Sequence, residues 1–110
     1  MAFRGALDAA RRTKADHDLS VSYDKLGDVQ VAQGDLAGAL TSYRDSLAIA
    51  DRLAKSDSGN AGWQRDLSVS YNKIGDVLKK QGKETEALNA FRQARTVMVD
   101  IASPSPDDAQ

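Results

Sequence analysis

His17 stands between Asp16 and Asp18, with several serines nearby. Histidine, a carboxylate and a serine hydroxyl are the three groups of a nucleophilic triad, in which the imidazole takes the proton of the hydroxyl. A triad also needs a pocket that excludes water and a donor that stabilises the oxyanion, and no motif in this chain supplies either. The sequence therefore favours a surface histidine, and we expect a chain that is not an enzyme.

Other reactive groups are equally sparse. The chain has one histidine and no cysteine, which excludes thiolate sites and sites with two imidazoles, so we expect no metal and no cofactor. Glu84 and Glu86 are interpreted as acids in a first helical turn, which favour the helix dipole. Lys79 and Lys80 form a small basic cluster without aromatic stacking platforms, and the net charge is −1. We therefore expect no nucleic-acid partner.

The composition predicts helices that could position such residues. The 110 residues include 17 alanines, and both prolines, Pro104 and Pro106, lie near the end of the chain. No apolar run reaches the roughly 20 residues of a membrane-spanning helix. The first residues also lack the apolar core of a secretory signal. We expect an all-α, cytoplasmic protein without a membrane partner.

An internal repeat organises the chain. Positions 18–44 and 66–92 share 15 identities in 27 aligned residues, at an offset of 48. A partial third copy comes first, because Phe3-Arg4-Gly5-Ala6-Leu7 resembles Tyr43-Arg44-Asp45-Ser46-Leu47. Repeats of this length indicate a stack of supersecondary units, each of which buries its apolar face against its neighbours.

Each full unit reads as two helices. Apolar residues recur at steps of three and four over about 61–81 and again over 84–102. Asn60 and Asp35 are placed to cap helix starts, while Gly34 and Gly82 are placed to end helices in a left-handed turn. The short joints predict antiparallel hairpins. Gly27 and Gly75 lie inside helices at equivalent positions, and we expect them to approach Ala39 and Ala87 closely.

The spacing Tyr23…Leu26-Gly27…Gly34…Ala39…Tyr43…Ser46 resembles the tetratricopeptide repeat, and Tyr71…Ile74-Gly75…Gly82…Ala87…Phe91…Ala94 resembles it again. The family's usual unit has 34 residues, so this longer unit is similar to the extended bacterial and kinesin-light-chain-like variants. The resemblance implies a short right-handed solenoid of about five antiparallel helices. It also implies a scaffold for protein–protein interaction.

The resemblance divides the chain into four segments. Residues 1–15 are expected to be the second helix of a partial leading repeat, and 16–60 the first full repeat. Residues 61–102 are expected to be the second repeat, and 103–110 a disordered tail. Leu36 and Leu47 are replaced by Glu84 and Arg95 one repeat later, which is typical of a terminal capping unit.

A second face of each first helix remains outside its hairpin, and in the family the matching positions line a concave groove. The expected groove residues are Val21, Asp24, Asp28, Val31, Val69, Asn72, Asp76, Lys79 and Lys80. A solvated face, with Val21 and Val69 packed between units, is the alternative interpretation. Some members of the family bind a terminal carboxylate with lysine and asparagine at groove positions, and here Asp28 and Asp76 stand where the resemblance would call for asparagine. The predicted partner is therefore a peptide or protein of basic or mixed character.

The beginning of the chain allows two conformations. No glycine or proline lies between Ala6 and Leu26, so residues 2–33 could form one helix, but the repeat favours a bend near Lys14–Asp16. The partial repeat also lacks its own hairpin partner, which predicts a possible homodimer through this segment. The alternative to an interaction scaffold is the structural end of a longer array, which mainly self-associates.

Overall fold

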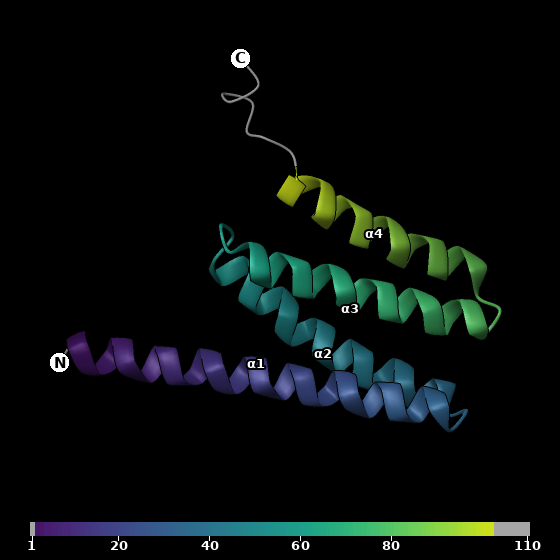
Figure 1. The fold of residues 1–110 in the computed structure, drawn as a ribbon, viewed down its shortest axis with the longest axis horizontal. Coiled ribbons are helices and arrows are strands. Elements are labelled where there is room, and N and C mark those ends of the chain that lie inside the picture. The colour runs from purple at the N-terminus through teal and green to yellow at the C-terminus, as the bar shows by residue number, and fades with distance from the viewer. Residues whose placement is uncertain (1, 103–110) are drawn as a thin grey trace, which may run out of the picture.

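The computed structural model describes the backbone of residues 2–102 and the side chains of residues 8–99. This part of the chain forms four helices: α1 (Ala2–Ala32), α2 (Leu36–Ser56), α3 (Ala61–Lys80) and α4 (Glu84–Ala102). Figure 1 shows them side by side in chain order. The predicted all-α class is confirmed, and the predicted helices at 61–81 and 84–102 agree with α3 and α4 within one residue. The expected disordered tail, 103–110, lies outside the described residues.

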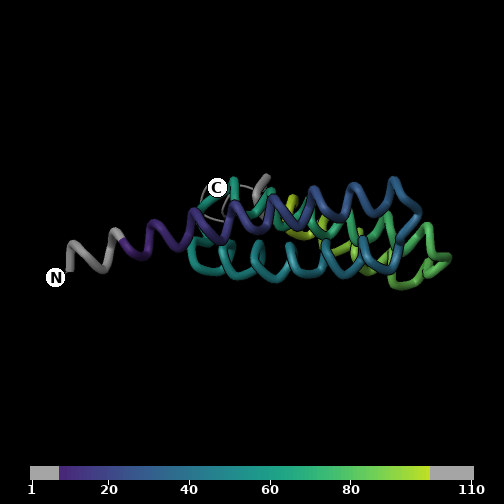
Figure 2. The backbone as a smooth tube through the Cα atoms, turned by 90° about the horizontal axis from the view of Figure 1, so that it is seen from below, coloured from purple at the N-terminus to yellow at the C-terminus, as the bar shows by residue number. Residues whose placement is uncertain are grey.

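The helices form a thin slab. α1 packs on α2, α2 on α3, and α3 on α4. The extents are 49 × 41 × 15 Å, and the edge-on view in Figure 2 shows α1 running over α2. The two-helix thickness follows from hairpins that stack beside one another. α2 and α3 each have one side against their hairpin partner and another against each other, whereas α1 and α4 form the outer edges.

Local sequence signals set the helix ends. The Asp35 carboxylate accepts a hydrogen bond from the Gly38 amide at 2.9 Å, and Asn60 accepts one from the Trp63 amide at 3.1 Å. These caps satisfy amides that lack an intrahelical partner. Gly34 and Gly82 have φ angles of 81° and 80°, in the left-handed region that glycine enters without steric cost. The predicted caps and turns are confirmed.

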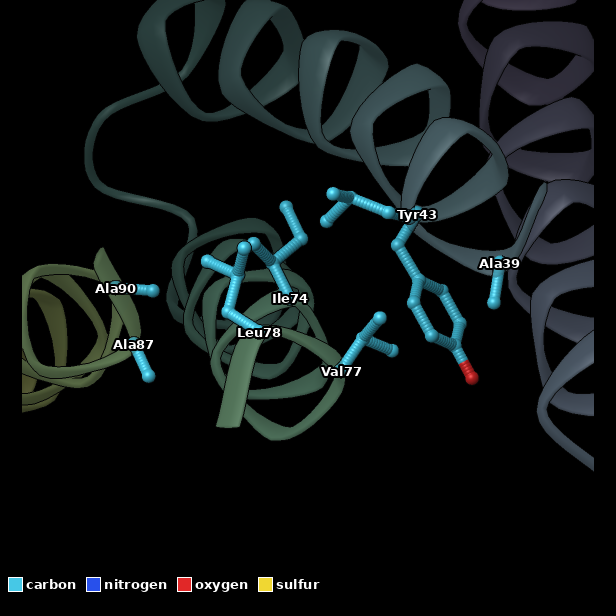
Figure 3. Packing of buried hydrophobic residues seen from close by; sticks show 8 residues of the cluster. Ala39, Tyr43, Ile74, Val77, Leu78, Ala87 and Ala90 are labelled. Atoms are coloured by element: carbon cyan, nitrogen blue, oxygen red, sulfur yellow. The ribbon is translucent and has the colours of Figure 1, made fainter. Parts of the chain in front are cut away.

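The main core lies between the two hairpins (Figure 3). Its buried residues come from α2, α3 and α4, and are Ala39, Leu40, Tyr43, Ile74, Val77, Leu78, Ala87 and Ala90. A second cluster joins Ala50 and Ala54 of α2 to Leu67 of α3. Alanines supply much of α2 and α4 in these contacts, which lets the helix backbones approach closely.

The predicted bend near Lys14–Asp16 is wrong, because α1 is one continuous helix of 31 residues. The described residues consequently form four helices and not five. The reason is local: the segment contains no glycine or proline that would interrupt the backbone hydrogen bonds, and alanine and arginine favour the helix. The repeat analogy predicted a break because a loop separates the corresponding helices, Leu36–Ser56 and Ala61–Lys80, but its residues are missing here.

The helical glycines face aromatic rings and not the alanines expected from the sequence. A Cβ atom on Gly75 would lie only 2.6 Å from Cε1 of Phe91, and one on Gly27 would overlap the ring of Tyr43. Both contacts lie inside a hairpin, between its first and second helix. The expected close approach is therefore present, but it accommodates a ring from the returning helix.

Candidate functional site

The candidate site is the face along which α1 and α3 lie side by side. A small cavity of about 60 Å³ opens between them, lined by His17, Ser20, Val21, Asp24, Asp66, Val69 and Ser70. Three predicted groove residues, Val21, Asp24 and Val69, are thus brought together from segments more than 40 positions apart in the sequence. We call this surface the inner face.

Asp24 is the most unusual side chain of the inner face. Its Oδ1 atom is buried and has no hydrogen-bond partner among the described residues. Burial raises the pKa of Asp24, because a carboxylate loses hydration when it is covered, and this effect outweighs the nearby Ser46 hydroxyl and the charge of Lys73, which lower the pKa. An acceptor left without a donor costs free energy, which a cationic ligand group could recover. The position therefore suits a group that carries several donors.

Asp28 lies farther along α1 and is already engaged. Its Oδ1 accepts hydrogen bonds from the Tyr43 hydroxyl at 2.5 Å and from Lys73 Nζ at 3.1 Å. Lys73 Nζ also lies 5.5 Å from the centroid of the Tyr43 ring. The three residues join α1, α2 and α3. Asp28 was predicted to line a groove, and the structure gives it a part in holding the two repeats together.

These contacts shift the pKa values of Asp28 and Tyr43. Burial by itself would raise the pKa of Asp28, but the hydrogen bonds from Tyr43 and Lys73 and the charge of Lys73 outweigh it, so the pKa is lowered. Burial and the neighbouring Asp28 raise the pKa of Tyr43. With Asp28 paired to Lys73, the acidic character of the inner face rests on Asp24 and Asp66.

His17 lies at one end of the inner face. Its ring centroid is 5.1 Å from that of Trp63, and Nε2 is 3.4 Å from a carboxylate oxygen of Asp66. Ser20 lines the same cavity, but its hydroxyl is hydrogen-bonded to the Ser46 hydroxyl at 2.9 Å. The nearby serine thus pairs with another serine, and the imidazole is held between an indole and a carboxylate of α3.

The other predicted groove residues do not join this cavity. Val31 packs against the main core. Asn72, Asp76, Lys79 and Lys80 are exposed. Lys79 instead lines a second hollow, of about 330 Å³, together with Glu84, Ala87, Leu88 and Phe91 of α4. Of the nine predicted residues, Val21, Asp24 and Val69 thus line the small cavity, Val31 packs on the core, and Lys79 lines the second hollow.

Sequence reasoning missed Asp66, Ser70 and Lys73, all of which face α1. Asp66 and Ser70 are four positions apart, and Lys73 follows three positions later, which places them on one side of α3. That spacing was available in the sequence. Which helix this side faces depends on how the two repeats stack.

Comparisons with known proteins agree with the fold. Residues 67–102 match the family model described as tetratricopeptide repeat. Neither the comparison with curated proteins nor that with solved structures found a match. Within residues 2–102, no helix is long and apolar enough to cross a membrane.

The matched segment contains most of α3 and all of α4, which is the second helical hairpin. The first hairpin repeats its sequence at an offset of 48 residues, and its two helices pack on each other as those of the second hairpin do. Tetratricopeptide repeats are interaction modules in general, and the antiparallel helices described above have the architecture of such repeats. The second hairpin therefore matches a tetratricopeptide repeat, and the first hairpin has the same repeat pattern in its sequence.

Proposed function

We propose that this chain is a non-catalytic scaffold that binds a peptide or partner protein through the inner face of α1 and α3. The ligand group that fits best is a lysine side chain. The observation that carries the proposal is the buried, unpartnered Oδ1 of Asp24 beside a cavity of about 60 Å³.

The cavity suits a lysine for three reasons. An ammonium group carries three donors and no acceptor, so it can satisfy Asp24 and reach Asp66. Val21 and Val69 provide apolar surface for the methylene stem, which long cationic side chains commonly use. The volume holds only a few water-sized groups, which favours a compact ammonium over a planar guanidinium.

The remaining charges of the inner face favour the same ligand. Asp28 and Lys73 compensate each other at 3.1 Å, so they add little net charge. Asp24 and Asp66 would repel a terminal carboxylate. We therefore propose a cationic or mixed partner and no carboxylate clamp, within a cytoplasmic protein of the extended, kinesin-light-chain-like type.

The test uses two synthetic probe peptides of equal length, one alternating lysine with alanine and the other alternating glutamate with alanine. Binding is followed by NMR through the methyl signals of Val21 and Val69. We expect saturable shifts with the lysine peptide only. Asp24→Asn, which keeps the shape and removes the charge, should weaken binding about tenfold or more.

Asp45→Asn is the matched control, because Asp45 is exposed on α2, away from the cavity. It changes the net charge equally and should leave the affinity unchanged. If the Asp24→Asn and Asp45→Asn variants bound the lysine peptide with equal affinity, the interaction would be non-specific charge attraction. Equal binding of the glutamate peptide would contradict the proposal directly.

A further inference from the structure

The two outer edges of the slab carry complementary halves of an interface that the molecule already uses internally. On the first edge, α1 presents three large apolar side chains, Leu19, Leu26 and Val29, which are 47–52% exposed. They recur at spacings of seven and three residues and therefore lie on one side of the helix. We call this row the α1 stripe.

The internal repeat shows what such a stripe does. Forty-eight positions later, α3 carries Leu67, Ile74 and Val77 at the same repeat positions, and these are only 1–7% exposed. Ile74 and Val77 pack with Ala39, Leu40 and Tyr43 of α2, while Leu67 packs with Ala50 and Ala54. The α3 version of the stripe is thus buried mainly against α2.

The opposite edge carries the receiving surface. The hollow of about 330 Å³ is lined by Lys79, Glu84, Ala87, Leu88 and Phe91. Every one of these has a counterpart 48 positions earlier that belongs to the main core or packs on it, namely Val31, Leu36, Ala39, Leu40 and Tyr43. Leu40 is 7% exposed under α3, whereas Leu88 is 54% exposed. We call this surface the α4 hollow.

We propose that the chain self-associates head to tail, with the α1 stripe of one copy seated in the α4 hollow of the next. The contact repeats the one that α3 makes with α2. A second copy is the occupant because this chain carries both halves of the interface, and no other described residue covers either half. The inference does not rest on the proposed function, since residues of the inner face take no part in it.

At both edges, some apolar residues of the internal contact are replaced by polar ones, and the polar groups of the two edges can pair with each other. Gln30 of α1 stands at the repeat position of Leu78, while Glu84 and Lys79 stand at those of Leu36 and Val31. Gln30 accepts a hydrogen bond from Ser42 through Oε1, which leaves its amide N–H groups to donate to a carboxylate. One end of the contact between copies is therefore polar, so the contact is weaker than the apolar α2–α3 contact and reversible.

The geometry of the contact determines the form of the assembly. Two different surfaces meet, so the interface is heterologous and each added copy leaves one α1 stripe and one α4 hollow uncovered. Association therefore continues beyond the dimer. The mean mass of the protein should rise steadily with concentration above the 11.8 kDa of one chain, without a plateau at a dimer.

The experiment compares two variants that each block one edge, Leu26→Asp and Leu88→Asp. Both residues are about half exposed, so the fold should be retained, as circular dichroism and thermal unfolding would establish. Sedimentation equilibrium of each variant alone should show association weakened about a hundredfold or more, because a carboxylate would be buried in an apolar contact. Ala48→Asp, on the exposed side of α2, is the matched control and should behave as the wild type.

Mixing the two blocked variants is the decisive step. Leu88→Asp keeps an intact α1 stripe and Leu26→Asp keeps an intact α4 hollow, so the mixture should form a dimer with one copy of each and no larger species. Fluorescence transfer between differently labelled variants would report the mixed pair. If the interface instead joined two identical edges, the variant with its substitution at the other edge would still associate by itself.

Three results would overturn the proposal. They are a wild-type chain that stays monomeric up to about 1 mM, a blocked variant that still associates as the wild type does, and a mixture that forms no mixed dimer. If both variants fold and yet all three proteins are monomeric, the exposed edges have another occupant. Self-association through residues 2–15 would survive both substitutions and would be recognised in the same measurements.

Discussion

The Tyr43 hydroxyl donates a hydrogen bond to Asp28 across the first hairpin, with an O···O distance of 2.5 Å. The second repeat has Asp76 and Phe91 at the equivalent positions, so the same bond cannot form there. Asp28 also binds Lys73 of the next repeat. Through Asp28, the Tyr43 hydroxyl therefore also supports the contact between the two repeats. Phe91 has no hydroxyl and cannot take this role in the second repeat.

Tyr43→Phe should lower the free energy of unfolding by about 1 kcal/mol at pH 7, because a hydrogen bond to a charged but partly exposed acceptor is lost. The lowered pKa of Asp28 means that its contribution is present above its unfolded pKa, near 4, and is lost as the pH falls through the folded value. The difference in the free energy of unfolding between Tyr43→Phe and the wild type should therefore shrink towards pH 2. Urea unfolding at both pH values measures it.

Tyr23→Phe is the matched control for this prediction. It removes the same hydroxyl from a half-buried tyrosine of α1 that makes no side-chain hydrogen bond within the described residues. It should change stability little at either pH. A loss as large as that of Tyr43→Phe would show that the hydroxyl effect is not specific to Asp28.

Gly75→Ala should destabilise the chain by about 1–3 kcal/mol, although alanine favours a helix over glycine by about 1 kcal/mol. The new Cβ would lie 2.6 Å from the Phe91 ring, which must shift inside the hairpin. Gly27→Ala should act in the same way through Tyr43. Thermal unfolding checks both variants, and Gly59→Ala, where a Cβ has no neighbour within 4 Å, should be neutral.

Gln30 and Ser42 form a hydrogen-bonded pair at 2.6 Å, and the second repeat has Leu78 and Ala90 in their places. Gln30→Leu alone or Ser42→Ala alone should destabilise the chain by about 1 kcal/mol, since each leaves one polar group without its partner. The double variant should recover most of the loss, because it reproduces the apolar pair of the second repeat. A double-mutant cycle measures the coupling, and strictly additive losses would contradict it.

Asp24→Asn should stabilise the fold at pH 7 even as it weakens binding of the lysine peptide. The raised pKa of Asp24 means that folding favours its protonated form, so its effect on stability is most favourable below the unfolded pKa and worsens as the pH rises through the folded value. Removing the charge should therefore raise the unfolding midpoint at pH 7. The gain should disappear near pH 3, which a pH series of thermal unfolding would reveal.

The sequence alone predicted much of the fold. Asp35, Asn60, Gly34 and Gly82 mark their helix ends because capping and left-handed turns depend on a few neighbouring residues. The 48-residue repeat predicted paired hairpins for the same reason, since each unit carries its own apolar periodicity. The error in α1 came from extending the repeat to a segment that lacks a helix-breaking residue.

The partners of the side chains depended on the tertiary structure. A helical face shows which residues point outward, but stacking and register decide whether Asp24 meets a cavity, Asp28 meets Lys73, or Gly27 meets Tyr43. These contacts join positions 16 to 45 residues apart, and small shifts between helices would change them. The sequence therefore determined the helices, their turns and their repeat, whereas the tertiary structure decided which polar groups of the described residues find a partner within the chain and which do not.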